Sequence, residues 1–237
     1  MTRQGPTPGR HGRRPGRVPG AGPRAAEARL PRLPWGPAAA KAEAEAGAGG
    51  AGGAGVREAR EELLALLEGT ERGAAASADR AAAVDAQVDV LQGLGADCRP
   101  WAAGRGEEAD GQWAVLYTTE EDTRAFLRLP LLQPEIFQTV DTAAMRISNH
   151  IVLAPGTSLR ADAPLEIVSE SRIRYFFESL NIEVFGLALP KIPVRGRVGG
   201  WSDTVVYTES GESSTLRILR NFRKDLIILE RREAALA

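Results

Sequence analysis

The feature that most limits the fold of this chain is a series of short runs in which side chains alternate with a period of two. In residues 111–119 (GQWAVLYTT), one set of side chains, Trp113, Val115 and Tyr117, alternates with a second set, Ala114, Leu116 and Thr118. Similar runs cover residues 136–140, 145–153, 165–168, 172–177, 204–208, 215–219 and 225–230. Short turn segments such as APG at 154–156 separate them, without a long helical pattern between. The pattern predicts antiparallel strands joined by hairpins.

The number of these runs indicates whether the sheet has free edges or closes on itself. A sheet of seven to nine strands exposes two edges unless it closes on itself, and closure removes them. We therefore predict a mainly β protein: a lipocalin-like antiparallel β-barrel with a short helical N-terminal extension. A β-sandwich is the alternative. A barrel of about eight strands either fills its interior with side chains or holds one small ligand.

The N-terminal segment has a different composition. Residues 1–55 consist largely of Gly, Ala, Pro and Arg, and the first forty residues carry eight arginines against one acid, Glu27. Such a segment cannot bury enough apolar surface to offset its ordering entropy, so we predict a disordered tail. Arginine without acids is typical of an organelle transit peptide, although serine is absent before Ser77. An arm for nucleic acid or anionic membranes and a misassigned start site are the alternatives.

Between the tail and the strands, the apolar spacing is helical. Leucines at 63, 64, 66 and 67 lie among Arg and Glu, which predicts an amphipathic helix ending near Gly69. Ser77 can cap a second helix, whose apolar stripe contains Ala81, Val84, Val88 and Leu91. We therefore expect a helical extension at residues 56–100 and the barrel at residues 101–237.

The residue types needed for catalysis or metal binding are scarce. Cys98 is the only cysteine, so an intrachain disulfide is excluded, and His150 is the only histidine outside the tail. A metal site needs several clustered ligands. A Cys98–His150 nucleophile pair is conceivable but has no motif to support it. We predict a non-enzymatic protein with no catalytic residues, no metal ligands and no cofactor.

Three groups of residues are candidates for a structural or binding role. The GQW triplet at 111–113 resembles the Gly-x-Trp of lipocalins, in which an arginine from a late strand packs over the tryptophan at the closed barrel end. Trp113 with Arg217 or Arg220 is therefore predicted to close one end of the barrel, a structural role that we prefer to ligand binding. The aromatic side chains predicted to line a ligand pocket, with packed core positions as the alternative, are Tyr117, Phe137 and Tyr175.

The third group lies in residues 185–194 (FGLALPKIPV), an apolar segment interrupted by Gly186, Pro190 and Pro193. Proline cannot donate to a sheet ladder, so this segment is not expected to be a central strand. Apolar side chains beside cations can enter a lipid surface whose headgroups are anionic. The lipid-surface candidates are Leu187, Leu189, Ile192, Arg195 and Arg197. A loop folded over one barrel end, as a lid or plug, is the alternative.

Several of these segments together resemble the PAP/fibrillin family of plastid lipid-associated proteins. The resemblance covers about residues 60–232 and rests on the segments 63–73 (LLALLEGTERG), 111–119, 136–141 (IFQTVD), 200–204 (GWSDT), 216–220 (LRILR) and 226–229 (LIIL). The chain departs from the family pattern near its end, where SST at 213–215 replaces an acidic pair and Asn221 follows Arg220.

The resemblance implies a chloroplast location, at thylakoids, at plastoglobules or in the stroma, and it makes the tail a chloroplast transit region. It also implies that the protein binds or coats hydrophobic molecules: carotenoids, prenylquinones, or membrane or plastoglobule lipids. The alternative is a scaffold that recruits or stabilises an enzyme of isoprenoid or quinone synthesis at thylakoids. We expect hydrophobic small molecules or lipids as partners, peripheral contact with a thylakoid or plastoglobule surface, and no nucleic acid.

Overall fold

A computed structural model describes residues 50–103, 105–129, 133–196, 198–208 and 215–232 of the chain. The predicted tail lies outside this part as far as residue 49. Its last residues form the first turns of helix α2 (Gly50–Leu67), which thus begins six residues before the predicted helical extension. The Ala/Gly run contains no proline, so a helix that is stable at Val56–Leu67 can extend backward through it.

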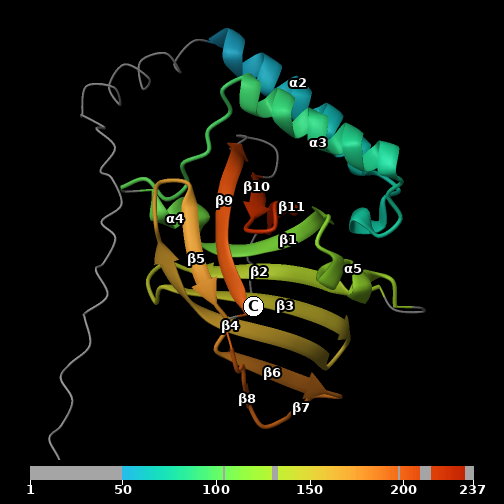
Figure 1. Ribbon diagram of the computed structural model, residues 1–237, viewed down its shortest axis with the longest axis vertical. Coiled ribbons are helices and arrows are strands. Elements are labelled where there is room, and N and C mark those ends of the chain that lie inside the picture. The colour runs from blue at the N-terminus through green and yellow to red at the C-terminus, as the bar shows by residue number, and fades with distance from the viewer. Residues whose placement is uncertain (1–49, 104, 130–132, 197, 209–214, 233–237) are drawn as a thin grey trace, which may run out of the picture. The chain divides into compact units, whose positions relative to one another are not determined.

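Eight antiparallel strands form a closed barrel among the described residues (Figure 1). Their order around the barrel is β3-β2-β1-β11-β10-β9-β5-β4, and pairing between β3 and β4 closes the ring. The bounds are β1 Gly111–Thr118, β2 Glu135–Asp141, β3 Arg146–Ala154, β4 Thr157–Ile167, β5 Arg172–Phe176, β9 Gly199–Thr208, β10 Leu216–Asn221 and β11 Leu226–Arg232. The prediction of a mainly β, lipocalin-like barrel with N-terminal helices is therefore confirmed.

Strand β4 pairs with two different strands along one of its edges. Its residues 165–167 pair with β5 inside the barrel ring, whereas residues 158–162 pair with β6 (Ser179–Val184) on the same edge. The two-residue strands β7 (Leu187–Ala188) and β8 (Ile192–Pro193) then pair with β6. We call residues 179–196 the flap, which lies below the barrel in Figure 1. The predicted strand at 165–168 is thus only the end of a longer one, and β6 was not predicted.

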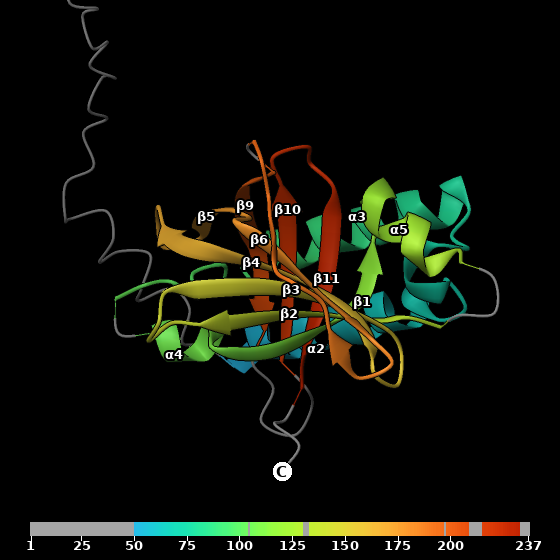
Figure 2. The same ribbon diagram turned by 90° about the horizontal axis from the view of Figure 1, so that it is seen from below.

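Two helices cover one outer face of the barrel, as Figures 1 and 2 show. Helix α2 and helix α3 (Ala78–Gly93) pack as a pair over β9, β10, β11 and β1. The Ser77 hydroxyl accepts a hydrogen bond from the Arg80 amide at 3.2 Å, which confirms the predicted cap. A buried cluster joins helices and sheet: Ala59, Leu63, Val84, Val88, Leu91, Tyr117, Val206, Ile218, Leu226 and Ile228.

The turn that joins α2 to α3 depends on one glycine. Gly73 ends the short 3-10 helix η1 (Glu71–Gly73) with φ +94°, and a Cβ there would lie 2.3 Å from the Thr118 carbonyl oxygen. Only glycine permits both this φ and this approach. The neighbouring Arg72 donates from Nη1 to the Pro134 carbonyl at 2.8 Å. The helical extension is therefore fixed to the end of β1.

A second apolar cluster fills the barrel. Its buried residues include Trp101, Trp113, Val115, Ile136, Val140, Ile147, Leu165, Ile173, Tyr207, Leu219, Ile227 and Leu229. Two short helices lie at the rims: α4 (Gly106–Ala109) precedes β1, and α5 (Glu121–Leu127) follows it. In the part of the chain that the structure describes, none of the helices is long and apolar enough to cross a membrane.

Candidate functional site

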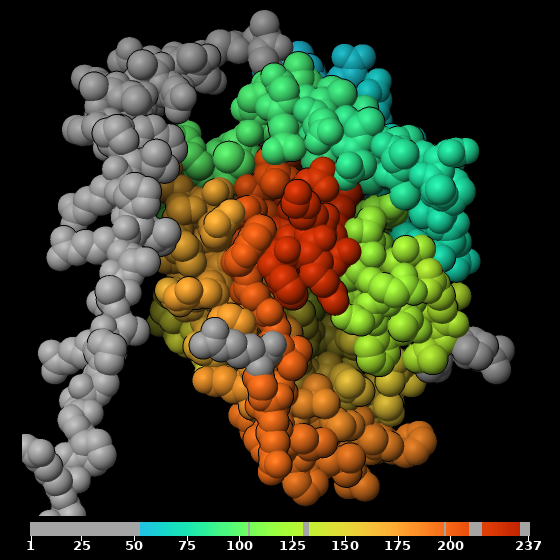
Figure 3. Space-filling view, in the orientation of Figure 1, coloured from blue at the N-terminus to red at the C-terminus, as the bar shows by residue number. Residues whose placement is uncertain are grey.

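The flap presents large apolar side chains to solvent. Phe185 is 87% exposed and Leu187 is 71% exposed, and Leu189 and Ile192 are exposed as well. Exposed apolar residues are common singly, but a cluster within one small hairpin marks an interaction surface. In the space-filling view the flap forms the lower end of the molecule (Figure 3).

The tip of the flap holds Phe185 in an unusual backbone conformation. Phe185 and Gly186 connect β6 to β7 and have φ +50° and +80°. Two central residues with positive φ define a type I′ turn, where Asn-Gly is the favoured pair. A bulky residue at positive φ costs free energy. The turn is held by the Gly186 amide, which donates to the Gly156 carbonyl at 2.8 Å. The chain thus keeps an aromatic ring in solvent at the tip despite local strain.

Basic side chains accompany this apolar cluster. Lys191 lies between Leu189 and Ile192, and Arg195 follows β8; both are exposed. The predicted lipid-surface residues Leu187, Leu189, Ile192 and Arg195 therefore lie together on the flap, whereas Arg197 lies outside the described residues. Phe185 and Lys191 were not predicted as lipid-surface residues, although both lie within the apolar segment 185–194.

One end of the barrel is closed around Trp113. The indole Nε1 donates to the Ala109 carbonyl at 2.9 Å, and the Tyr207 hydroxyl donates to the Glu108 carbonyl at 2.9 Å. Arg231 donates to the Asp110 carbonyl at 2.8 Å and to carbonyls of α4, and its guanidinium carbon lies 5.7 Å from the Trp113 ring centroid. Arg231 was not predicted, yet it lies directly opposite Trp113 in the β1–β11 ladder.

The two arginines that were predicted to pack over Trp113 occupy different environments. The Arg217 guanidinium carbon lies 4.5 Å from the Trp113 ring centroid, inside the barrel. Arg220 points to the outer face, where Nη2 lies 2.8 Å from Oδ1 of Asp85 on α3. Because β10 places every second side chain inside, Arg217 and Arg220 cannot share a face. Trp113 is therefore flanked by Arg217 and Arg231.

Arg217 is a buried cation with incomplete hydrogen bonding. It is 0% exposed, and burial lowers the pKa of its guanidinium to about 9. Nη2 donates to Oε1 of Gln138, whose own Nε2 donates to Oδ1 of Asn149 at 3.2 Å. Among the residues that the structure describes, Nε and Nη1 of Arg217 have no hydrogen-bond partner. A buried donor without a partner costs free energy, so this arrangement needs a physical reason.

Two of the three predicted ligand-lining aromatics border a small interior cavity. Phe137 and Tyr175 line it together with Gln138 and Asn149, and its volume is about 30 Å³. Burial raises the pKa of the Tyr175 hydroxyl, so it stays protonated. Tyr117 instead lies under the helices, because β1 has a bulge between Val115 and Tyr117 that reverses the alternation. A volume of this size holds one or two water molecules, not a prenylquinone.

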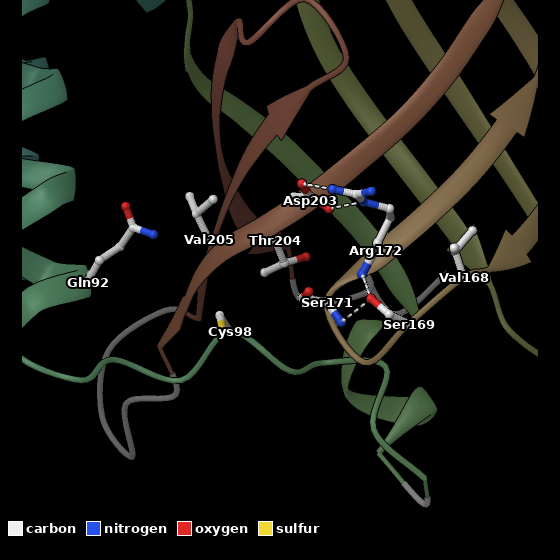
Figure 4. A pocket seen from close by; sticks show the side chains of 9 residues that line it. All are labelled: Gln92, Cys98, Val168, Ser169, Ser171, Arg172, Asp203, Thr204 and Val205. Atoms are coloured by element: carbon white, nitrogen blue, oxygen red, sulfur yellow. Dashed lines mark hydrogen bonds and ion pairs between the residues drawn. The ribbon is translucent and has the colours of Figure 1, made fainter. Parts of the chain in front are cut away.

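A shallow depression of about 340 Å³ lies outside the barrel, beside the β4–β5 turn (Figure 4). Its lining includes Cys98, Arg172 and Asp203. Arg172 and Asp203 neutralise each other through two hydrogen bonds of 2.5 and 2.7 Å. Burial raises the pKa of the Cys98 thiol, which disfavours the reactive thiolate. His150 lies elsewhere, on β3, with its ring 6.5 Å from that of Phe137.

Comparison with known proteins agrees with this architecture. The model of the PAP_fibrillin family matches residues 57–229, which cover most of α2, all of α3 and nearly all of the barrel. Searches of curated proteins and of solved structures gave no match. Because the matched region is most of the chain, the protein belongs to the PAP/fibrillin family, whose members are plastid lipid-associated proteins.

Proposed function

We propose that this protein is a non-enzymatic component of plastid lipid surfaces, which it contacts through the flap. The observation that carries the proposal is the exposed, strained Phe185 at the flap tip, with Leu187, Leu189 and Ile192 behind it. Transfer of one such side chain from water to an apolar medium contributes about 1.5–3 kcal/mol. A few inserted side chains therefore suffice for reversible peripheral binding.

Charge on the flap supports the same function. Lys191 and Arg195 are exposed beside the apolar side chains. A Lys or Arg near an anionic membrane surface contributes about 1 kcal/mol. We expect the apolar tip to enter the lipid surface while the two cations remain at the headgroups. The flap would thus act as the anchor of a thylakoid or plastoglobule protein.

The packing of the barrel favours coating of lipid over carriage of a large ligand. The cavity beside Phe137 and Tyr175 has a volume of about 30 Å³, and Trp113, Arg217 and Leu219 fill the interior nearby. A carotenoid or prenylquinone needs a pocket of several hundred Å³. Contact with such molecules is therefore assigned to the lipid phase that the flap enters. A scaffold that brings a quinone-synthesis enzyme to the membrane would use the same anchor.

Vesicle flotation tests this function. The full chain is mixed with vesicles of phosphatidylcholine and phosphatidylglycerol and centrifuged through a density gradient. The wild type should float, and a variant with Leu187→Ser, Leu189→Ser and Ile192→Ser should remain at the bottom with unchanged circular dichroism. The matched control replaces exposed valines away from the flap, Val90→Ser with Val168→Ser, and should float like the wild type. Equal flotation of the flap variant and the wild type would refute the anchor.

A further inference from the structure

One face of the sheet that runs from β2 to the flap is apolar. Four aliphatic side chains lie directly opposite one another in the ladders of β2, β3, β4 and β6: Ile136, Ile151, Leu159 and Ile182. Directly opposite residues of antiparallel strands point to the same face of the sheet. Ile136 belongs to the buried cluster that fills the barrel. The row therefore begins in the barrel interior and ends on the flap.

A second row lies beside the first on the same face. Its members are opposite one another across β2, β3, β4, β6 and β8: Gln138, Asn149, Ala161, Leu180 and Ile192. The row starts with two amides, continues with a small alanine and ends at Ile192, which is exposed on the flap. Because Ala161 is smaller than its neighbours in the row, it leaves space above the sheet between the amides and Leu180.

The two faces of this part of the sheet differ in polarity. The opposite face of β4 and β6 carries Ser158, Arg160, Asp162, Asn181 and Glu183. An apolar sheet face normally packs against a second layer. Leu159, Leu180 and Ile182 are nevertheless only half-buried. In the space-filling view, the surface is hollowed between α5, the β10–β11 turn and the flap (Figure 3). The apolar face is thus open to a ligand.

The inner ends of both rows meet the 30 Å³ cavity. Ile136, Gln138 and Asn149 belong to the rows and also line this cavity, together with Tyr175. Among the described residues, Nδ2 of Asn149 and the Tyr175 hydroxyl form no hydrogen bond. Burial, with the nearby Glu120 carboxyl, raises the pKa of this hydroxyl, so it keeps its proton. Both groups can donate to an oxygen atom, and the cavity has room for one.

The charge at the cavity disfavours an anionic head group. Of the described residues that line the cavity, Glu120 is the only charged one. Its carboxyl oxygens already accept hydrogen bonds from Asn221 at 2.7 Å and from Thr123 at 3.0 Å. A ligand carboxylate would lie beside this carboxyl in a poorly hydrated site, where like charges repel. A hydroxyl or carbonyl oxygen carries no charge and avoids this repulsion.

We propose that a neutral, single-chain amphiphile binds to this face, with its hydroxyl or carbonyl oxygen at Tyr175 and Asn149 and its hydrocarbon chain along Ala161, Leu180 and Ile192. Strands lie about 4.8 Å apart, so the path from Asn149 to Ile192 is about 14 Å long. The inference rests on the proposed lipid-surface function and deepens it, because the path ends on the flap. The chain lies on the open face and leaves the filled barrel interior intact.

Calorimetric titration of the full chain with 1-dodecanol and with sodium dodecanoate, without vesicles, tests this site. The wild type should bind 1-dodecanol roughly tenfold more tightly than dodecanoate. Ala161→Phe should abolish the binding of 1-dodecanol, because the ring occupies the path of the chain. Ala188→Phe makes the same change on the opposite face of the flap, where Ala188 pairs with Glu183, and should bind like the wild type.

Tyr175→Phe tests the head group and keeps the proposal testable if Ala161→Phe does not fold. The variant should bind 1-dodecanol roughly tenfold more weakly, through the loss of one hydrogen bond. Tyr207→Phe removes a hydroxyl at the closed end of the barrel and is the matched control, which should bind like the wild type.

The possible outcomes separate this site from the flap anchor. Unchanged binding of 1-dodecanol to folded Ala161→Phe would overturn the path of the chain. Equal binding of dodecanoate, or full binding by Tyr175→Phe, would overturn the head-group site, and no binding to the wild type would overturn both. Ala161→Phe should still float with vesicles, because its exposed flap side chains are unchanged. Failure of the wild type to float refutes the anchor, whereas failed titration with intact flotation refutes this site alone.

Discussion

Arg231 lies directly opposite Trp113 in the β1–β11 ladder, and both side chains bind carbonyl oxygens of the segment that includes α4. The indole binds Ala109, and the guanidinium binds Asp110 at 2.8 Å. The pair therefore fixes the short helix across the barrel end. In this protein, Arg231 of the last strand, β11, lies beside Trp113 of the lipocalin-like Gly-x-Trp segment.

The first prediction concerns this arginine. Arg231→Met removes the donors to three backbone carbonyls, and hydrogen bonds to a charged group contribute about 1.5–3 kcal/mol. We expect the Tm to fall by roughly 3–12 °C, at about 2–4 °C per kcal/mol for a chain of this size. The adjacent, exposed Arg232→Met is the control and should leave the Tm unchanged. Calorimetry that gave equal Tm values for both variants would contradict this role.

Trp113 itself should contribute more. It is fully buried between Arg217 and Arg231, and removal of a buried tryptophan side chain costs about 3–5 kcal/mol. Trp113→Ala should lower the free energy of unfolding by this amount in urea titrations. Trp113→Phe keeps an aromatic face but loses the bond to Ala109, so its loss should be smaller. An unchanged unfolding midpoint for Trp113→Ala would mean that the tryptophan does not hold the barrel end.

Glu120 gives a prediction about pH. Burial raises the pKa of its carboxyl above the ordinary value of 4.5, although Asn221 and Thr123 donate to its oxygens at 2.7 and 3.0 Å. The folded protein therefore binds this proton more tightly than the unfolded chain, and stability falls as the pH rises from 4.5 through the folded pKa.

Glu120→Gln removes this ionisation and keeps an acceptor for Asn221. The variant should have a higher Tm than the wild type at neutral pH, and the difference should disappear at pH values below 4.5. Glu135→Gln, which changes an exposed carboxyl, serves as the control and should show no such pH-dependent difference. A difference in Tm that stayed constant with pH would contradict the shifted pKa.

The cations of the flap should set its preference among lipids. Replacing Lys191 and Arg195 by Gln removes two charges, each worth about 1 kcal/mol at an anionic surface, so binding should weaken roughly 30-fold. The loss should occur with vesicles that contain phosphatidylglycerol and shrink at high salt, because screening weakens the attraction. Binding to pure phosphatidylcholine should not change. A similar loss on both kinds of vesicle would show that the residues act through packing.

The sequence was sufficient for the architecture because period-two runs and short turns leave few arrangements. It also located the apolar flap, since glycine and proline exclude residues 185–194 from a central strand. The register between neighbouring strands could not be predicted from the sequence. The bulge after Val115 places Tyr117 outside the barrel, and only the pairing of β1 with β11 shows that Arg231 faces Trp113. The strand β6 was missed although its sequence, SLNIEV, alternates polar and apolar residues, so the signal for a strand was present.

The most direct test of the account is the environment of the flap tip on a lipid surface. In a Cys98→Ser background, Leu187→Cys is labelled with an environment-sensitive fluorophore, and Asp79→Cys on α3 is labelled as the control. On vesicles of phosphatidylcholine and phosphatidylglycerol, the label at 187 should shift to the blue and be quenched by brominated acyl chains, while the label at 79 should do neither. Vesicle-bound protein whose label at 187 remained in water would contradict the central claim.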